Sequence, residues 1–569
     1  MQPPQEEIAI STGKAGLQND QDHSEDISET NHQNDDGVIE SPAIITPSIA
    51  ADLPSIVSDA LPTTQAKTST APSRTVLPPP SEYEIETEAE IECQDMYGIN
   101  YLNYAATHQI SYCESESNSG LQCFNAHGRP HPHNVPADTF CVAQGVEITQ
   151  EPTHDLNTGA STPHPNIGMQ CRLRNFTTER LKHPEKAESE LKWVANIDNL
   201  ETYFFDTGAK MQLYDMKISP VEELSGRQCT RDTHGNSTWI LLARREGNHN
   251  IWHKFMETWQ AMLTFDTMRM AINPSSGEPY MTEEDVRNAL IVFDDDREEP
   301  YDDWWHIVAN NGNPLLRKND LAPGCYSNIV LPLAGSSSNF WPLIISPGYQ
   351  PPCHNPFFFR AVRSRMFSHL KLTPRSATST RQHPTMTFID RRKKRIIYDS
   401  DHLLTKLRNM YPHSTLNVVD FSQLTLKAQV ELILDTDILI GTHGSALLHL
   451  LWMHPDTAYV EIKPVSFPFH WRTFAAFNSI NYFDTMAVWP EVWNWTTHKI
   501  KPAPGWKPPT ENNDWQDGQY IYLDETDFLR TVDAAVRSQK AKMSTGQPPK
   551  VLQCDDQTCE YVEVVAGQD

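Results

Sequence analysis

Short apolar runs alternate with amphipathic stretches through the second half of the chain. Four of the apolar runs predict buried strands, at 385–389, 416–419, 437–440 and 458–462. The amphipathic stretches between them predict helices, at 402–410, 424–434 and 445–453. Strands that alternate with helices are typical of a doubly wound parallel sheet, so the second half predicts an α/β domain.

The first half carries a similar but sparser pattern. Apolar runs at 238–243 and 288–293 predict two strands. The apolar positions of 251–263 fall on one helical face between these strands, and 357–370 predicts an irregular or helical bridge. The first half therefore predicts a second α/β unit.

A last amphipathic helix is predicted at 528–536, with Asp524 as its N-cap. With two α/β units and this returning helix, we expect an α/β protein with two facing Rossmann-like domains and a cleft between them. The expected segments are a disordered acidic stem rich in Ser, Thr and Pro at 1–85, a Cys-containing N-terminal elaboration at 86–145, α/β domains at 146–375 and 380–515, a closing segment and helix at 516–540, and a C-terminal tail at 541–569.

The charge balance makes one class of partner unsuitable. The chain has 569 residues, a formal net charge of -28 and a pI of about 5.2. Because an acidic surface repels a phosphate backbone, we expect no nucleic-acid partner.

Ten cysteines and three N-glycosylation sequons favour an oxidising compartment. The even cysteine count is typical of disulfides, and Asn175, Asn236 and Asn494 each begin an Asn-x-Ser/Thr sequon. Against this, residues 1–30 lack the basic and apolar regions of a signal peptide, and no stretch has the roughly 18 apolar residues of a membrane span. We expect a protein of the Golgi or endoplasmic reticulum lumen whose membrane anchor is missing from this sequence; a cytosolic protein is the alternative.

A glycine-rich turn follows the apolar run at 437–440. Gly441 and Gly444 permit close backbone approach, and His443 can donate a hydrogen bond to a phosphate. A helix that begins at Ser445 would present free N–H groups and its dipole to an anion. A serine hydrolase would need a Gly-x-Ser-x-Gly elbow, which this turn lacks at the second glycine. Glycines that serve only the geometry of the turn are the other interpretation.

Five consecutive basic residues, 391–395, follow the apolar run at 385–389. They fall between a predicted strand and a predicted helix, at the edge where open α/β sheets bind ligands. The guanidinium groups of Arg391 and Arg395 can each donate two parallel hydrogen bonds to a diphosphate. A nuclear localisation signal and a solvated turn are the alternatives.

These two motifs, together with Glu461, resemble glycosyltransferase family 61. The likeness includes positions 388–396 and 436–444, and continues through Leu447, His449, Leu450, Pro455 and Glu461, with further matches at 250–255 and 520–536. The family usually has Ala-Gly where this chain has Ser445 and Ala446, and an Asn where it has Tyr398 and Asp399. A catalytically inactive relative that binds a nucleotide sugar or glycan therefore stays an alternative.

The resemblance implies a GT-B fold and inverting transfer of a sugar from a UDP-sugar. It makes 146–375 the acceptor-side domain and 380–515 the nucleotide-sugar-binding domain. The implied donor-binding residues are Arg391, Arg395, Gly441, His443, Gly444, Ser445 and Glu461. The arginines would neutralise the departing diphosphate, the turn would add hydrogen bonds and dipole, and the glutamate would bind the ribose hydroxyls.

Inversion needs a general base beside the acceptor hydroxyl. His253, at the start of a predicted helix, is the best candidate, and a core histidine is the other interpretation. Asp294 and Asp296 form an Asp-x-Asp at a predicted strand end, where Asp294 is a second candidate base and Mn²⁺ binding or a solvated turn are alternatives. No cofactor is expected to be required, because basic residues usually replace the metal in GT-B proteins.

Three more histidines stand close together in the sequence, at His127, His131 and His133. They lack the spacing of a zinc site, so they predict a loop.

We therefore expect a glycosyltransferase that moves GlcNAc or xylose from a UDP-sugar to a hydroxyl of a protein or glycan. Its partners would be the nucleotide sugar and the acceptor, with membrane contact only through an anchor. An intracellular interaction protein that uses the basic run as a targeting signal is the second alternative.

Overall fold

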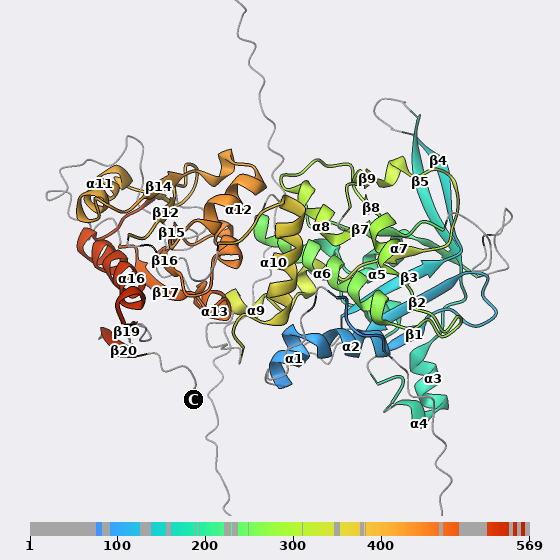
Figure 1. Cartoon of the computed structure of the whole chain (residues 1–569). Helices are drawn as coiled ribbons and strands as arrows, with labels where there is room; N and C mark the ends of the chain where they lie inside the picture. Colours follow the sequence, from blue (N-terminus) through green and yellow to red (C-terminus); the bar gives the residue numbers. More distant parts are fainter. Residues whose placement is uncertain are drawn as a thin grey trace, which may run out of the picture. The chain divides into compact units, whose positions relative to one another are not determined.

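A computed structural model of the whole chain gives the arrangement of its elements (Figure 1). The structure describes residues 76–81, 83, 91–125, 138–154, 161–187, 189–192, 194–220, 229, 237–247, 250–309, 311–345, 353–375, 381, 383–465, 470–488, 520–545, 550–554 and 559–563. The predicted stem at 1–85 lies outside them apart from 76–81 and 83, as do His127, His131 and His133. The contacts divide the chain into Met1–Ala71 and Pro72–Asp569, and every described residue belongs to the second unit.

The second half folds around a five-stranded parallel sheet. In spatial order its strands are β14 (Leu416–Val419), β12 (Met386–Ile389), β15 (Ile438–Thr442), β16 (Ala458–Lys463) and β17 (Asn481–Met486). In chain order this arrangement is 2-1-3-4-5, one of the common doubly wound orders, with its switch point between β12 and β15. The four strands predicted from the apolar pattern are confirmed, and β17 is an additional one.

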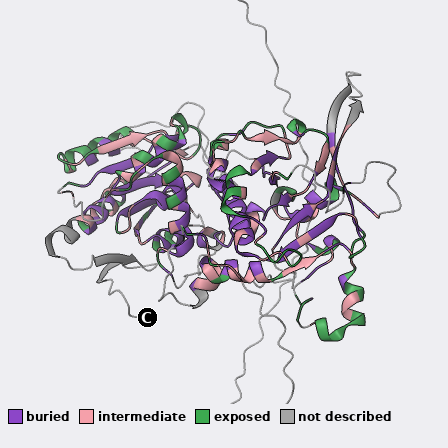
Figure 2. Ribbon diagram, turned by 45° about the vertical axis from the view of Figure 1, so that its right-hand side comes forward, coloured by how far each residue is buried: buried purple, intermediate pink, exposed green. Residues whose placement is uncertain are grey.

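Helices cover both faces of this sheet. They include α11 (Ser400–Met410), η7 (Phe421–Gln423), α12 (Leu426–Leu434), η8 (Ser445–Trp452), α13 (Arg472–Phe477) and α16 (Glu525–Thr545). Ile438 and Ile440 of β15 belong to the core that contains α11 and α16, whereas Leu439 between them belongs to the core that contains α12 and η8. Successive strand side chains point to opposite faces, and because both faces are covered, β12 and β15 are buried at every position. Figure 2 shows these strands largely buried.

The first half is built on a seven-stranded mixed sheet. In spatial order its strands are β1 (Gln109–Ser111), β2 (Gly120–Asn125), β3 (Thr139–Gln144), β11 (Ile329–Leu331), β7 (Ile240–Ala243), β8 (Leu290–Phe293) and β9 (Leu316–Arg317). Strands β11, β7, β8 and β9 are parallel, whereas β1, β2 and β3 pair antiparallel and join the sheet at β11. The Cys-containing segment 86–145 thus supplies three strands, and this sheet is mixed rather than parallel throughout.

Smaller sheets and further helices complete the described part of the chain. A four-stranded sheet has the order β10 (Gly324–Tyr326), β4 (Val146–His154), β5 (Ser161–Gln170) and β6 (Lys217–Ser219). Two strand pairs are β13 (Ile396–Ile397) with β18 (Tyr520–Ile521), and β19 (Lys550–Cys554) with β20 (Cys559–Glu563). Other helices are α1 (Ile91–Tyr97), α2 (Ile99–Thr107), α3 (Phe176–Lys182), α4 (Pro184–Ala187), η1 (Ile197–Asn199), η2 (Phe204–Asp206), α5 (Ala209–Asp215), α7 (Glu283–Asn288), η4 (Asp302–Trp305), α8 (His306–Ala309), η5 (Lys318–Asp320), η6 (Gly335–Ser337) and α9 (Pro342–Ile345).

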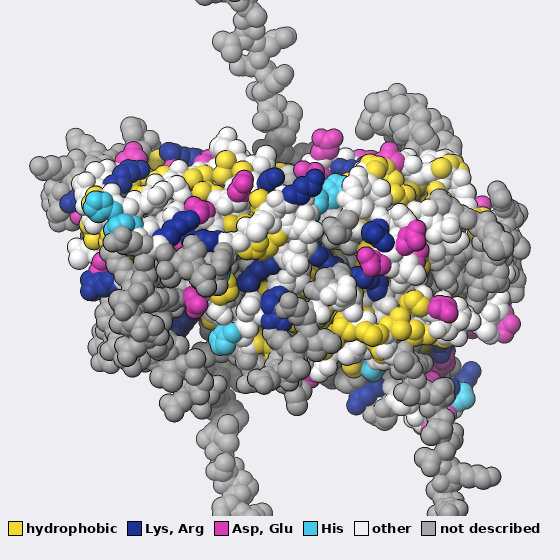
Figure 3. Space-filling view, viewed as in Figure 1, with side chains coloured by type: hydrophobic (Ala, Val, Ile, Leu, Met, Phe, Trp, Pro, Cys, Tyr) yellow, Lys and Arg dark blue, Asp and Glu magenta, His cyan; other side chains and the backbone are white. Residues whose placement is uncertain are grey.

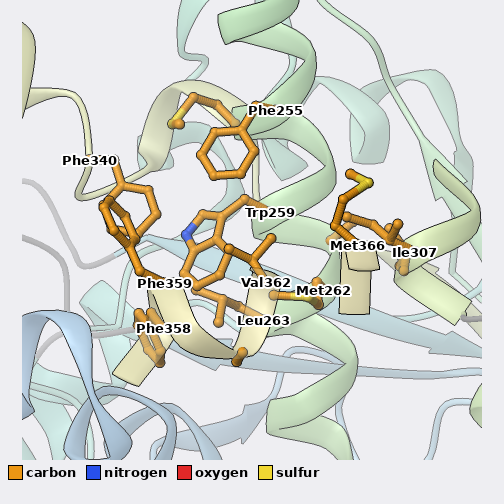
Figure 4. Close-up of a cluster of buried hydrophobic side chains, with 14 of the residues drawn as sticks. Phe255, Trp259, Met262, Leu263, Ile307, Phe340, Phe358, Phe359, Val362 and Met366 are labelled. Atoms are coloured by element: carbon orange, nitrogen blue, oxygen red, sulfur yellow. The ribbon is translucent and has the colours of Figure 1, made fainter. Parts of the chain in front are cut away.

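The long helix α6 (Ile251–Met270) is the centre of packing in the first half. Almost all of its residues are buried, including polar ones such as Lys254, Glu257 and Asp266, so the helix is covered on every side and not only along its apolar stripe. Its Trp259 packs against Phe340 and Phe358, with ring centroids 4.9 Å and 5.0 Å apart (Figure 4). Phe358 belongs to α10 (Phe357–Leu370), so the predicted bridge is a helix. The same core continues through η8 and α13 into the second half.

Four disulfides tie distant parts of the first half together. The pairs are Cys93–Cys353, Cys113–Cys171, Cys123–Cys141 and Cys229–Cys325. Disulfides form and persist in oxidising compartments, so these pairs agree with the expected location in the lumen of the secretory pathway. Among the described residues, no helix combines the length and apolarity needed to cross a bilayer.

Acidic and basic side chains are interspersed on the face drawn in Figure 3. Lys and Arg side chains are scattered over this face, and only some of them have Asp or Glu side chains beside them.

Candidate functional site

The basic run and the glycine turn meet beyond the carboxyl ends of β12 and β15. Strand β12 ends at Ile389, just before the basic run, and β15 ends at Thr442, just before His443. Arg395 joins the two segments, because its Nη1 donates a hydrogen bond of 2.6 Å to the backbone carbonyl of His443. This place is the switch point of the sheet, where open α/β folds bind their ligands.

Gly444 allows two guanidinium groups to lie against the turn. A Cβ at this position would clash with Nη1 of Arg391 and would lie 3.4 Å from Nη1 of Arg395. Burial lowers the pKa of Arg391, with Asp420 opposing the shift, but an arginine in a protein keeps its charge. The turn and the basic run therefore bring two cations to one point of the sheet edge.

His443 is held by a buried carboxylate. Its Nδ1 lies 2.6 Å from Oε1 of Glu461, a side chain with no exposed surface. The other carboxylate oxygen accepts hydrogen bonds from the backbone N–H of Trp471 at 3.0 Å and from the hydroxyl of Tyr482 at 2.6 Å. Burial lowers the pKa of His443, and Arg395 and Arg391 lower it further, against the opposing effect of Glu461. The structure thus places Glu461 beneath the histidine, where it fixes the ring.

The two remaining predicted donor residues frame the turn. A Cβ at Gly441 would lie 3.1 Å from Leu447 and 3.3 Å from Ile389, so this glycine lets the strand end pack closely against apolar neighbours. Ser445 is the first residue of η8, and Gly444 is its N-cap. This helix is a 3-10 helix rather than the α-helix that the pattern suggests.

The basic run is also anchored from the far end of the chain. Strand β13, which follows Arg395, pairs with β18 so that Ile396 lies opposite Tyr520. The backbone N–H of Tyr398 donates to the carbonyl of Ile521 at 2.8 Å, and the Tyr398 and Tyr522 rings stack with centroids 5.1 Å apart. Hydrophobic periodicity does not reveal strands of two residues, so this anchoring was missed.

The candidate base His253 also contacts a buried acid. Asn250 caps α6 by accepting a hydrogen bond of 2.9 Å from the Trp252 backbone, which puts His253 in the first turn. Its Nδ1 contacts Oε2 of Glu246, whose side chain has no exposed surface, while the imidazole is 20% exposed. Glu246 was not predicted, and its only sequence signal is an acid close behind the strand at 238–243. The His253–Glu246 pair repeats the arrangement of His443 and Glu461.

Both aspartates of the Asp-x-Asp pair already contact polar side chains. Asp294 lies 3.1 Å from Nζ of Lys318 and 3.6 Å from Nη1 of Arg244. Asp296 accepts a hydrogen bond of 2.8 Å from Asn319. A divalent ion at Asp294 would have to displace both cations. Within the described ranges, no three His, Cys, Asp or Glu side chains gather in a group that could hold a metal.

One aromatic cluster lies between the two histidines. The Trp252 ring meets the Trp471 ring edge-on at 5.0 Å and the Trp341 ring at 5.9 Å. His253 lies 5.1 Å from Trp341, and His443 lies 6.4 Å from Trp471, measured between ring centroids. The candidate base in the first half and the candidate anion site in the second half, made of Arg391, Arg395 and His443, are therefore connected through tryptophan rings, of which Trp252 and Trp471 are buried.

The comparisons with known proteins fit this geometry. Residues 306–460 match the sequence model of the family described as Glycosyltransferase 61, a span that includes the basic run and the glycine turn and ends one residue before Glu461. The EGF domain-specific O-linked N-acetylglucosamine transferase of Drosophila melanogaster is 27% identical over 255 residues, which make up 43% of this chain and 45% of that protein. The match thus spans less than half of the length of this curated relative. The resemblance to glycosyltransferase family 61 predicted from the sequence is confirmed, and the matched segment includes Arg391, Arg395 and His443 of the candidate anion site.

Proposed function

We propose that this chain is an inverting glycosyltransferase that moves a sugar from a UDP-sugar to a hydroxyl of a protein or glycan. The observation that carries the proposal is the gathering of Arg391, Arg395 and His443 at the switch point of a doubly wound sheet. Such a place suits a diphosphate, because it combines fixed cations with backbone N–H groups. The similarity of 306–460 to glycosyltransferases supports a sugar diphosphate as the ligand.

GlcNAc and xylose are the donor sugars that we propose. The Drosophila relative is an O-linked N-acetylglucosamine transferase, which favours N-acetylglucosamine. The departures at Ser445 and Tyr398 from the usual family pattern keep xylose as the second choice. A GT-B arrangement, with the acceptor bound by the first half and the nucleotide sugar by the second, is part of the same proposal.

In the proposed reaction, the acceptor oxygen forms a bond to the anomeric carbon as the bond from that carbon to the diphosphate oxygen breaks. The diphosphate leaves with the electron pair, and Arg391 and Arg395 stabilise its added charge. His253 takes the acceptor proton at Nε2, because Nδ1 faces Glu246. Glu246 and Glu461 act as positioning residues, each fixing one histidine ring. No metal has a role in this proposal, since the arginines supply the positive charge that Mn²⁺ would bring.

The two ends of the basic run make the targeting alternative unattractive. Positions 392–394 are exposed, whereas Arg391 and Arg395 are half-buried against the glycine turn, and Arg395 donates a hydrogen bond to it, so the run does not present one continuous basic segment to a receptor. The four disulfides further favour a protein of the secretory lumen, and we propose the Golgi or the endoplasmic reticulum.

Calorimetric titration with UDP, UDP-GlcNAc and UDP-xylose tests the proposal on the full chain made in a secretory host. Arg395→Ala should weaken binding about 10- to 100-fold, because it removes charge-assisted hydrogen bonds. Arg392→Ala is the matched control, since that side chain is 69% exposed and pairs with Asp390. Absence of binding by every UDP compound would refute the proposal. Binding without transfer or hydrolysis of any donor would identify the inactive relative.

A further inference from the structure

A cavity of about 790 Å³ lies in the first half, beyond the ends of three parallel strands. Arg244 follows β7, Asp294 follows β8 and Lys318 follows β9, and all three side chains line the cavity. The carboxyl edge of parallel strands is the usual ligand edge of an open sheet. The volume falls within the range of about 300–1,000 Å³ that is typical of sites for small molecules.

The cavity wall is polar, and its five acidic residues slightly outnumber its four basic residues. Each basic residue of the wall is paired with an acid of the wall: Lys318 lies 3.1 Å from Asp294, Arg297 lies 3.2 Å from Asp295, and Arg244 contacts Asp215. Arg245 pairs with Asp295 in the same way. Such a wall offers many oriented donors and acceptors without the net positive charge that a diphosphate needs. It suits a neutral ligand with many hydroxyl groups.

An exposed aromatic ring stands at the rim of this cavity. The Phe205 residue is 60% exposed, although it is a large apolar residue. Its backbone has a φ of 55°, and Tyr203 and Asp206 nearby also have positive φ values, of 61° and 55°. Non-glycine residues with a positive φ have a strained backbone, and such strain concentrates at functional sites. The fold thus holds an apolar ring in water beside a polar wall.

The ring and the wall both border the candidate base. The Phe205 ring centroid lies 6.4 Å from that of His253, and Glu246, which contacts His253, is itself a lining residue. The faces of a sugar ring carry C–H groups that pack on the negative face of an aromatic ring, while its rim carries hydroxyl groups. A sugar therefore matches both surfaces at once, and an unmodified peptide side chain matches neither as fully.

We propose that this cavity binds a saccharide acceptor, with one neutral sugar ring on Phe205 and its hydroxyl groups hydrogen-bonded to the ion-paired wall. The inference rests on the proposed transferase function and names its acceptor class. One hydroxyl of the bound sugar then faces His253, which removes its proton. Acceptor selection resides in Phe205 and the wall, separate from the donor site around Arg395.

Binding and turnover together test this inference on the full chain. Saturation-transfer NMR with neutral mono- and disaccharides measures acceptor binding directly, and release of UDP from a donor measures turnover. Phe205→Ala should raise the KM for a saccharide about tenfold with a smaller effect on kcat, whereas Phe205→Tyr keeps the ring and should stay near the parent value. Tyr214→Ala is the control, because Tyr214 is 51% exposed but does not line the cavity.

Three outcomes separate the two proposals. Saccharide binding that weakens in Phe205→Ala and not in Tyr214→Ala, together with UDP release that depends on the saccharide, supports the inference. Bound UDP with transfer to an unmodified peptide, and no saccharide binding, overturns the saccharide acceptor but keeps the transferase. Absence of UDP binding refutes the proposed function, and the NMR experiment then tests the cavity by itself.

Discussion

His443 and Glu461 form a buried pair across two neighbouring strands, with Nδ1 2.6 Å from a carboxylate oxygen that has no exposed surface. In the ladder of β15 and β16, Glu461 lies opposite Gly441, two residues before the histidine. The carboxylate also accepts hydrogen bonds from Trp471 and Tyr482, so its position is fixed from three sides. The buried carboxylate of Glu461 thus fixes the orientation of His443 at the candidate anion site.

Glu461→Gln should weaken both folding and donor binding. The amide has one acceptor oxygen for the three groups that face the carboxylate, and leaving a buried donor unpaired costs about 1–3 kcal/mol. Tyr482→Phe removes a single donor and leaves the contact with His443, so it should lower stability without weakening UDP binding. Thermal unfolding and calorimetric titration of both variants distinguish the roles. Equal loss of UDP affinity in the two would contradict the positioning role of Glu461.

UDP should bind more tightly as the pH falls, through His443. Burial and two arginines lower the pKa of this histidine in the free protein, so it is neutral near pH 7. A bound diphosphate raises that pKa, because negative charge favours the imidazolium. The affinity for UDP therefore increases as the pH falls from the pKa that His443 has in the complex toward the lower pKa that it has in the free protein. Calorimetric titrations of the parent and of His443→Gln with UDP at pH 8 and pH 6 measure the effect, because the variant retains only the part of the pH dependence that comes from the phosphate itself. The same change in UDP affinity in both proteins would exclude a role of His443.

The two glycines of the turn should respond differently to alanine. At Gly444 the new methyl meets the flexible end of Arg391, which can move away at small cost in stability but leaves the anion site. At Gly441 the methyl meets Leu447 and Ile389, so overpacking should destabilise the fold by about 1–3 kcal/mol. Gly444→Ala should thus lose affinity for UDP at a nearly unchanged melting temperature. Gly441→Ala should lower the melting temperature and leave the affinity for UDP nearly unchanged. Matching losses of stability would show that both glycines serve packing alone.

His253→Ala should slow transfer by about 10²–10⁴-fold and leave the Kd for UDP unchanged, as expected for a general base on the acceptor side. Glu246→Gln should have a smaller effect of the same kind, because the imidazole is kept but less firmly oriented. Single-turnover rates at saturating donor measure both. A His253→Ala enzyme with the parent rate would remove this residue from the mechanism, and Asp294→Asn would then be the next variant.

The sequence predicts the second half of the fold far better than the first. Strands of a doubly wound sheet are apolar on both faces, so Met386 to Ile389 and Ile438 to Ile440 are plain in the sequence. Strands such as Gln109–Ser111 and Leu316–Arg317 are short and half-buried, and pairing with a neighbouring strand rather than their own apolar pattern makes them strands.

The meeting of the basic run with the glycine turn could be predicted, because each follows a strand end that the apolar pattern locates. The pairing of His253 with Glu246 could not be predicted in the same way. Glu246 follows β7, and it meets the first turn of α6 only because of the path of the chain between them. Tertiary packing sets that path, and the local hydrophobic pattern does not reveal it.

Acid should destabilise the protein through His449, which lies in the core below the anion site. Burial lowers the pKa of His449 to about 3, and its Nε2 lies 2.8 Å from Oε1 of Gln429. The unfolded chain binds a proton below its ordinary pKa of about 6.5, whereas the folded state stays neutral down to about pH 3. Stability from this group is therefore present above pH 6.5 and decreases as the pH falls, by about 1.4 kcal/mol per pH unit. His449→Gln can donate to the same oxygen without titrating, so its melting temperature should fall less than that of the parent between pH 7 and pH 5. Parallel curves for the two proteins would show that His449 does not govern the acid sensitivity.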